Sequence, residues 1–305
     1  MTQTEQPTDC AIRAITDDGA FRVITIRTTD MVRAAIDAQD ATGICAKTFA
    51  ELLTGAVLVR ETMSPENRVQ VILKPDHNNK GMFATLVADS HPEGLTRGLV
   101  QGEVSDENPP RFGEGMVLQV IRVLFNKELH QGIVPTSREG GVSEALNDYM
   151  MSSEQITSVI EVAAHVEDGE VVSAAGFIVQ MLPEVSVEAL APMLAHLEKR
   201  PALREILADR GARPAETMAR LMDGFDHTVL SQEPVSFGCI CSQERIFQAI
   251  STLPADEISE LIDGGNQLEV ACEYCKTPYV DLAALVERGD VDAVEGAAVV
   301  LLDGA

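Results

Sequence analysis

Four of the six cysteines lie in two close pairs near the end of the chain, and they constrain the fold more than any other feature. One residue separates Cys239 from Cys241, two separate Cys272 from Cys275, and residues 242–271 lie between the pairs. Two local pairs supply the four thiolates of a tetrahedral Zn²⁺ site and leave only one long loop to close. Six cysteines in 305 residues are too few for a secreted scaffold built on disulfides. The pattern predicts metal or redox chemistry in a reducing compartment.

Three hypotheses fit this spacing. The first is a permanent structural zinc site, and the second is a thiol–disulfide oxidoreductase that uses Cys272 and Cys275. Such oxidoreductase motifs usually begin a helix, whereas here a strand pattern precedes Cys272 and Pro278 follows Cys275. The third is a redox sensor that loses its metal on oxidation. Structural zinc contributes about 10–16 kcal/mol to the apparent folding of a small domain, so metal loss would unfold it.

The net charge excludes several classes of partner. The chain has 23 Lys and Arg against 48 Asp and Glu, a formal charge of −25. This charge repels phosphate backbones and anionic lipids, and no basic cluster offsets it, so we expect neither a nucleic acid nor a membrane as partner. No apolar run approaches the ~20 residues that span a bilayer, and the first residues lack the pattern of a signal peptide. We therefore expect a cytoplasmic protein.

Residues 1–185 have the pattern of an α+β core domain. Residues 1–18 are polar, so we expect a frayed segment in which Cys10 is a bystander thiol, whereas Cys45 lies on an apolar helical face and belongs to the core. The periodicity predicts helices near 30–36, 43–63 and 142–151, and strands near 21–28, 69–74, 82–88, 115–125, 156–166 and 171–181. Strands gathered around a few helices without a regular βαβ rhythm indicate an α+β domain of mixed sheet and helix.

The rest of the chain divides into three parts. Pro192, Pro201 and Pro214 break residues 186–235 into short amphipathic helices, which are too short to be stable alone. This helical linker either completes the core or docks only conditionally. Residues 236–290 form a small four-cysteine zinc domain with helices after Ser242 and near 255–262 and a strand near 267–271, and residues 291–305 form a tail. A domain as small as residues 236–290 cannot bury enough surface to be stable alone, so we expect a cross-link to stabilise it.

The cysteine segments resemble the zinc module of the redox-regulated 33 kDa chaperonin family. The resemblance rests on Phe237-Gly-Cys239-Ile-Cys241-Ser and on Glu269-Val-Ala-Cys272-Glu-Tyr-Cys275 followed by Tyr279. It continues upstream through Arg27-Thr-Thr-Asp30, Leu52-Leu-Thr-Gly-Ala56, Leu95-Thr-Arg97-Gly98, Ser143-Glu-Ala-Leu146 and Ala174-Ala-Gly176. These motifs follow the family's order and cover essentially residues 12–290.

The resemblance implies a cytoplasmic, ATP-independent holdase chaperone and not an enzyme. Cys239, Cys241, Cys272 and Cys275 would hold one Zn²⁺ per chain in the reduced, inactive state. Oxidation would form the disulfides Cys239–Cys241 and Cys272–Cys275, release zinc, unfold the module and the linker, and activate the binding of unfolded client proteins. Active members of the family also form homodimers. The six histidines are scattered and have no catalytic spacing.

Client binding requires adaptable apolar surface, and the linker carries several candidates. Methionine among them would allow contacts to repack around different clients. An ordinary core stripe explains any single one of these residues equally well. The candidates are Leu190, Met193, Leu194, Leu197, Leu221 and Met222.

Overall fold

The computed structural model describes most of the chain up to residue 245 and a second, shorter stretch. The described residues are 8–76, 78, 84–102, 112–113, 115–138, 140–183, 187–208, 213–245 and 269–281. The chain divides into two compact units, Met1–Gly238 and Cys239–Ala305, which we call the main unit and the cysteine module. Among the described residues, no helix combines the length and the apolar character needed to cross a membrane.

The main unit contains two sheets. Sheet A has the order β10-β1-β2-β9-β8, and all its neighbouring strands are antiparallel. Its strands are β1 (Cys10–Thr16), β2 (Phe21–Arg27), β8 (Ser158–Glu167), β9 (Glu170–Met181) and β10 (His227–Pro234). Sheet B has the order β11-β5-β4-β3-β6-β7, and only β11 is parallel to its neighbour. Its strands are β3 (Arg68–Pro75), β4 (Thr85–Ser90), β5 (Leu95–Gln101), β6 (Met116–Val123), β7 (Leu129–Pro135) and β11 (Ser236–Phe237).

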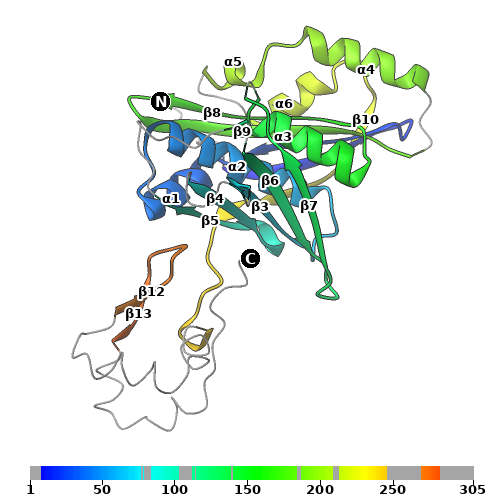
Figure 1. Ribbon diagram of the computed structural model, residues 1–305. Coiled ribbons are helices and arrows are strands. Elements are labelled where there is room, and N and C mark those ends of the chain that lie inside the picture. Colours follow the sequence, from blue (N-terminus) through cyan, green and yellow to red (C-terminus); the bar gives the residue numbers. More distant parts are fainter. Residues whose placement is uncertain are drawn as a thin grey trace. The chain divides into compact units, whose positions relative to one another are not determined.

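Helices α1 (Thr29–Gln39) and α2 (Gly43–Glu61) lie between the two sheets (Figure 1). Helix α2 contacts β3 and β4 of sheet B as well as β8 and β9 of sheet A. Burial on both sides explains why its side chains are apolar around most of the circumference, and Phe49, Leu52 and Leu58 have no exposed surface. A short helix α3 (Val142–Tyr149) continues into one π turn, Met150–Glu154. The predicted α+β fold is confirmed.

Three further helices cover the other face of sheet A (Figure 1). These linker helices are α4 (Val187–Lys199), α5 (Leu203–Ala208) and α6 (Pro214–Leu221). They build a second apolar core with side chains of β1, β2 and β9. Of the candidate client-binding residues, the four that are buried in this core are Met193, Leu197, Leu221 and Met222. Leu190 packs against it half-buried, and Leu194 is 40 % exposed.

Two expectations about secondary structure are wrong. The frayed segment expected over residues 1–18 contains strand β1, which is buried between β2 and β10, and Cys10 is buried rather than a surface bystander. Residues 227–234, expected in the helical linker, form strand β10 on the free edge of β1. The two strands pair with each other across more than 200 positions, which local periodicity does not register, and β1 also pairs with the neighbouring strand β2. Strands β5 and β7 also lack a prediction from the sequence pattern.

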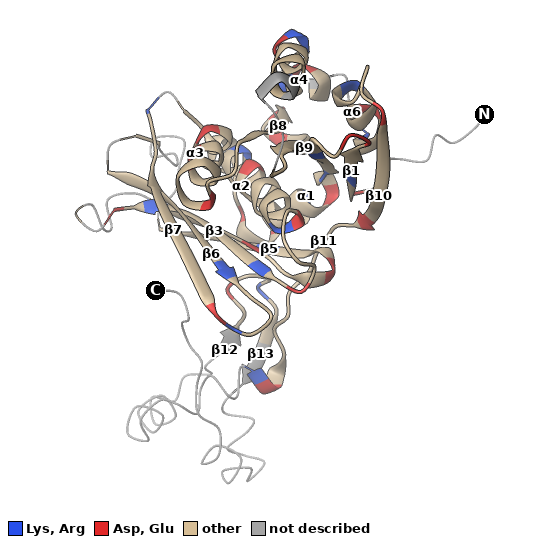
Figure 2. Cartoon of the chain, turned by 90° about the vertical axis from the view of Figure 1, so that its right-hand side faces the viewer, with Lys and Arg blue, Asp and Glu red and all other residues tan. Residues whose placement is uncertain are grey.

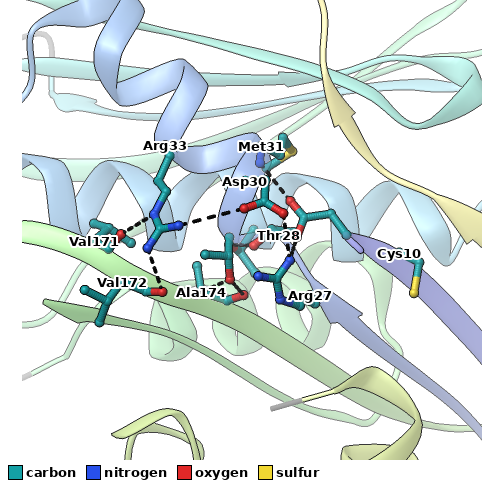
Figure 3. Close-up of polar contacts among 12 residues, drawn as sticks. Cys10, Arg27, Thr28, Asp30, Met31, Arg33, Val171, Val172 and Ala174 are labelled. Carbon is teal, nitrogen blue, oxygen red and sulfur yellow. Dashed lines mark hydrogen bonds and ion pairs between the residues drawn. The ribbon is translucent and has the colours of Figure 1, made fainter. Parts of the chain in front are cut away.

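Asp9 fastens the start of β1 to helix α1. Its Oδ2 accepts a hydrogen bond from the Met31 backbone N–H at 2.7 Å, and Arg27 pairs with both Asp9 and Asp30. Figure 3 shows the Arg27–Asp30 pair and the neighbouring Arg33, which donates to backbone carbonyls of β9. Burial raises the pKa of the Asp9 carboxyl despite these contacts. Such a tethered carboxylate orders a segment whose composition alone suggests fraying.

Candidate metal centre

The four paired cysteines converge on one point. Their Sγ atoms all lie within 4.8 Å of one another, with 3.6 Å between Cys239 and Cys272 and 3.4 Å between Cys241 and Cys275. Four thiolates around a tetrahedral Zn²⁺ at about 2.3 Å would be about 3.8 Å apart, so both the donor set and the spacing fit zinc. The sulfurs are too far apart for disulfides, which require about 2.05 Å, and all six cysteines are free.

A tight turn presents the second pair. Strands β12 (Glu269–Ala271) and β13 (Pro278–Asp281) form a two-stranded antiparallel sheet. Between them, the Lys276 N–H donates to the Cys272 carbonyl at 2.7 Å, and the Cys272 N–H donates to the Thr277 carbonyl at 3.0 Å. Lys276 takes a left-handed conformation with φ of 56° to close the turn. The expected strand near 267–271 is therefore present as β12.

The first pair lies on irregular backbone that ends in a capped turn. The Arg245 N–H donates to Ser242 Oγ at 3.3 Å, as expected of an N-cap, and the Arg245 side chain donates to the Ile240 carbonyl at 3.0 Å. Residues 246–268 lie outside the described residues, and with them the helix expected near 255–262 and most of the helix expected after Ser242. Both cysteines of this pair are half-buried.

Hydrogen bonding makes one thiol acidic. Burial acts to raise the pKa of Cys275, but hydrogen bonds from the Thr277 hydroxyl, whose Oγ1 lies 3.2 Å from the sulfur, and from the Thr277 backbone lower it to about 7. In Cys272, burial prevails and raises the pKa. Thr277 has no role in the sequence analysis; its hydroxyl two positions after the last cysteine is the signal that could have identified it. Cys275 therefore loses its proton more readily than Cys272, and its thiolate is the form that binds a metal or reacts with an oxidant.

The remaining cysteines do not contribute to this centre. Cys45 packs in the core between the sheets, as predicted, and burial raises the pKa of its thiol to about 11. Burial also raises the pKa of Cys10, which lies apart from the Arg27 contacts in Figure 3. Among the described residues, no second group of three or more His, Cys, Asp or Glu is arranged to hold a metal ion. Cys272 follows a strand rather than beginning a helix, which does not favour an oxidoreductase.

Comparisons with known proteins agree with this arrangement. The family model described as Hsp33 protein matches residues 9–280. The 33 kDa chaperonin of Citrifermentans bemidjiense is 27% identical over 298 residues, which cover 94% of this chain and 97% of that protein. The 33 kDa chaperonin of Listeria welshimeri is 29% identical over 283 residues, covering 89% of this chain and 94% of that protein.

A solved structure supports the fold independently. The crystal structure of the 33 kDa chaperonin from Thermotoga maritima matches with a TM-score of 0.76 at 22% identity and covers 93% of this chain and 99% of that one. The family match extends through the cysteine motifs as far as residue 280. The chain therefore belongs to the Hsp33 family of redox-regulated holdase chaperones, which carry a C-terminal four-cysteine cluster and are not enzymes.

Proposed function

We propose that this chain is an ATP-independent holdase whose activity is switched by the oxidation state of its four clustered cysteines. In the reduced state, Cys239, Cys241, Cys272 and Cys275 hold one Zn²⁺ per chain. The observation that carries the proposal is the convergence of four free thiols within 4.8 Å in a unit separate from the main unit. When bound, zinc supplies the cross-links that a unit of this small size needs.

Oxidation forms the disulfides Cys239–Cys241 and Cys272–Cys275. Each pair gives two electrons to an oxidant such as peroxide, which takes up two protons and leaves as water. The closest sulfurs belong to different pairs, but every sulfur is within reach of the others. Once the metal is lost and the module unfolds, the partners within each pair stay close, whereas residues 242–271 separate the pairs. Loop-closure entropy therefore favours the two short disulfides.

Zinc release then unfolds residues 236–290, and the linker helices α4, α5 and α6 follow. Disulfides in such small loops restrict the unfolded chain little, so they do not replace the metal's contribution. Undocking of the linker helices from sheet A exposes apolar side chains that pack in the second core, namely Leu190, Met193, Leu197, Leu221 and Met222, beside Leu194, which is already exposed. We propose that clients bind to these six side chains.

The partners are unfolded or partly unfolded proteins in the cytoplasm, and the oxidised chain forms a homodimer. The formal charge of −25 keeps a chaperone that exposes apolar surface in solution, and also keeps its complexes with clients there. The charge scarcely changes with oxidation state, so solubility does not depend on the switch.

The test compares one protein preparation in two redox states. Reduced, zinc-loaded protein is treated with peroxide at elevated temperature, while a colorimetric chelator measures zinc release and light scattering measures the aggregation of a heat-unfolding client. We expect zinc release to precede suppression of aggregation, and a reductant to reverse both. Retained zinc after oxidation would refute the switch, and equal protection in both states would identify a constitutive binding module with inert zinc.

A further inference from the structure

The short strand β11 covers one edge of sheet B where the chain leaves the main unit. Residues 235–238, which we call the cover segment, contain this strand, and Cys239 is the next residue of the chain. Phe237 lies opposite Thr96 of β5, and the two strands run parallel. Figure 2 shows β11 beside β5 and helix α1, which contacts both strands. The edge of β5 is thus covered by the residues that directly precede the four paired cysteines.

Apolar side chains on one face hold the cover segment in place. Val235 is buried in the core between the sheets, and Phe237 packs half-buried against the same core. Ser236, between them, is exposed. Side chains alternate in this way along an extended strand. An extended segment of another polypeptide with apolar residues at two alternate positions therefore has the pattern that this seat on the main unit accepts.

Backbone groups at the edge of β5 are paired while the cover segment is present. The Gly238 N–H donates to the Thr96 carbonyl at 3.1 Å. Further along β5, the Val100 N–H points to the same edge and donates to the side-chain oxygen of Gln39 at 3.1 Å. Departure of the cover segment would take the partner from the Thr96 carbonyl. Unpaired backbone groups at the edge of a sheet recruit other strands.

The cover segment fits closely against the main unit. A Cβ at Gly94 would lie 2.2 Å from the Pro234 carbonyl oxygen, and a Cβ at Gly238 would lie 2.6 Å from the Leu95 side chain. Gly94 also has a φ of 76°, which favours glycine. These two glycines allow backbone to approach backbone at this edge. The seat is therefore shaped for an extended polypeptide.

We propose that an extended apolar segment of an unfolded client replaces the cover segment on β5 when the cysteine module unfolds. This inference rests on the proposed function, in which residues 236–290 unfold after zinc release. The occupant follows from β11 itself, because a stretch of polypeptide with alternating apolar side chains already pairs with this edge. Backbone pairing accepts many sequences, which suits a chaperone. In the reduced state the edge stays covered, as an inactive chaperone requires.

The cover segment competes with every client, because it stays attached to β10. Only two of its residues form a strand, and so short a strand opens locally at little cost once the chain that follows it is unfolded. A client that also contacts the apolar side chains of the linker helices binds at two places. The second contact is then intramolecular, which favours the client over the cover segment.

The experiment opens the edge without oxidation, in the full, reduced and zinc-loaded chain. Phe237→Asp puts a carboxylate into an apolar seat and should release the cover segment. The probe is a fluorescent peptide with the sequence of residues 232–238, and fluorescence anisotropy measures its affinity. We expect the variant to bind it about tenfold more tightly than the unaltered reduced chain does, because the seat of one aromatic side chain becomes free. Peroxide treatment should bring the unaltered chain towards the same affinity.

A matched control changes a phenylalanine that holds nothing in place. Phe125 lies between β6 and β7 and is 72 % exposed, so Phe125→Asp should bind the peptide no better than the unaltered reduced chain. Zinc content should be the same in both variants, which shows that the cysteine module is retained. Equal peptide binding by the two variants would overturn the proposal, and so would the absence of binding by Phe237→Asp.

Two N-methylated peptides separate strand pairing from general apolar adhesion. A methyl group on the glycine amide removes the bond to the Thr96 carbonyl and should abolish binding to Phe237→Asp. A methyl group on the phenylalanine amide, which points away from β5, should weaken binding far less. Equal effects of the two methyl groups would refute strand pairing.

Failure of this inference and failure of the proposed function give different results. If oxidation released no zinc, the redox switch would be wrong, whereas Phe237→Asp would still report on the edge of β5. If zinc were released and neither the oxidised chain nor Phe237→Asp bound the peptide, the switch would stand and the client site on β5 would be refuted.

Discussion

The main unit and the cysteine module are stabilised in different ways. The main unit has two apolar cores, one between its sheets and one under the linker helices. In the cysteine module, the described regular structure is a two-stranded sheet with one capped turn, and Cys272 is buried. A domain this small buries little apolar surface against the entropy of folding, so we expect the cysteine module to depend on the metal that its four thiols would hold. On this proposal, packing stabilises the main unit and is unaffected by oxidants, whereas metal-bound thiolates stabilise the cysteine module and react with them.

The linker helices are intermediate in how firmly they are held. They bury apolar side chains on sheet A, but each helix is short, and polar contacts at the edge of the core help to hold them. The Arg200 guanidinium stacks over the Phe177 ring at 4.4 Å and pairs with Glu161, which also accepts a hydrogen bond from the Leu203 N–H at 2.7 Å. These contacts contribute only a small free energy to docking, so a local change is enough to release the linker helices from sheet A.

Removal of zinc should give the largest difference between the two units. Chelation under reducing conditions takes away about 10–16 kcal/mol of apparent folding free energy, so the cysteine module should unfold and the linker helices should undock, while the two sheets of the main unit stay folded. Hydrogen exchange is the measurement: amides of residues 269–281 should lose protection, and amides of β2 and β9 should keep it. Cys241→Ser should reproduce the result without a chelator. Simultaneous loss of protection in β2 and β9 would show that the two units share one source of stability.

Removal of the buried charge of Asp89 should lower the stability of the main unit and leave the cysteine module unaffected. Asp89 has no exposed surface, and its carboxylate contacts Arg68 at 2.6 Å, Arg97 at 2.9 Å and His91 at 2.8 Å. Asp89→Asn should lower the unfolding free energy of the main unit by about 3–5 kcal/mol, because it removes the buried charge that pairs with the partly buried Arg68 and Arg97. Zinc content should not change. Asp30→Asn, at a carboxylate that is 58% exposed, should have a much smaller effect.

The effect of Asp89 should depend on pH with a definite sign. Burial acts to raise the pKa of this carboxyl, but the hydrogen bonds from His91 and Arg68 outweigh it and hold the pKa well below its usual value. The stabilisation is therefore complete above the unfolded-state pKa, about 3.9, and is lost as the pH falls through the folded-state value. Denaturant titrations should show that the unfolding free energies of the unaltered chain and of Asp89→Asn become equal only in strong acid. Protons should displace zinc from the thiolates at a higher pH, before the main unit weakens.

The linker should respond to a milder change. Glu161→Gln keeps an acceptor for the Leu203 N–H but removes the charge that pairs with Arg200, which should loosen docking by about 1 kcal/mol. We expect faster activation of the holdase by peroxide with unchanged zinc content in the reduced protein. Glu216→Gln changes an exposed pair with Arg213 on the outer side of α6 and is the matched control. Equal activation rates in all three proteins would show that docking does not limit the switch.

The sequence predicts the site better than it predicts the strands, for a physical reason. A metal centre built from two short pairs is local in sequence, so the spacing of Cys239, Cys241, Cys272 and Cys275 contains most of its geometry. Helix α2 and strands β2, β3 and β9 also follow from periodicity. Strand β10 does not, because it is exposed on both faces and no apolar alternation marks it. It forms because its backbone pairs with the edge of β1.

Contacts between side chains are the part of the structure that the sequence predicts least well. The carboxylate of Asp89 and its arginines come from three different strands, and no spacing in the sequence shows that they meet. The contact between Thr277 and Cys275 is local, but it depends on a turn whose left-handed residue is a lysine rather than the glycine that would have marked it. The sequence therefore predicts the ligands, and the structure adds the groups that tune them.

A change at Lys276 gives the smallest expected difference between the two units. Lys276 has a φ of 56°, which costs a residue with a Cβ about 1 kcal/mol, so Lys276→Gly should relieve strain in the turn that presents Cys272 and Cys275. Part of the gain is lost because glycine is more flexible when unfolded, which leaves about 0.5 kcal/mol, or about twofold tighter zinc binding. Competition with a chelator measures this. The matched change, Asp168→Gly, relieves a φ of 52° in the turn between β8 and β9, and it should raise the stability of the main unit without altering zinc affinity. A gain in zinc affinity from Asp168→Gly as well would mean that the two units are coupled before oxidation begins.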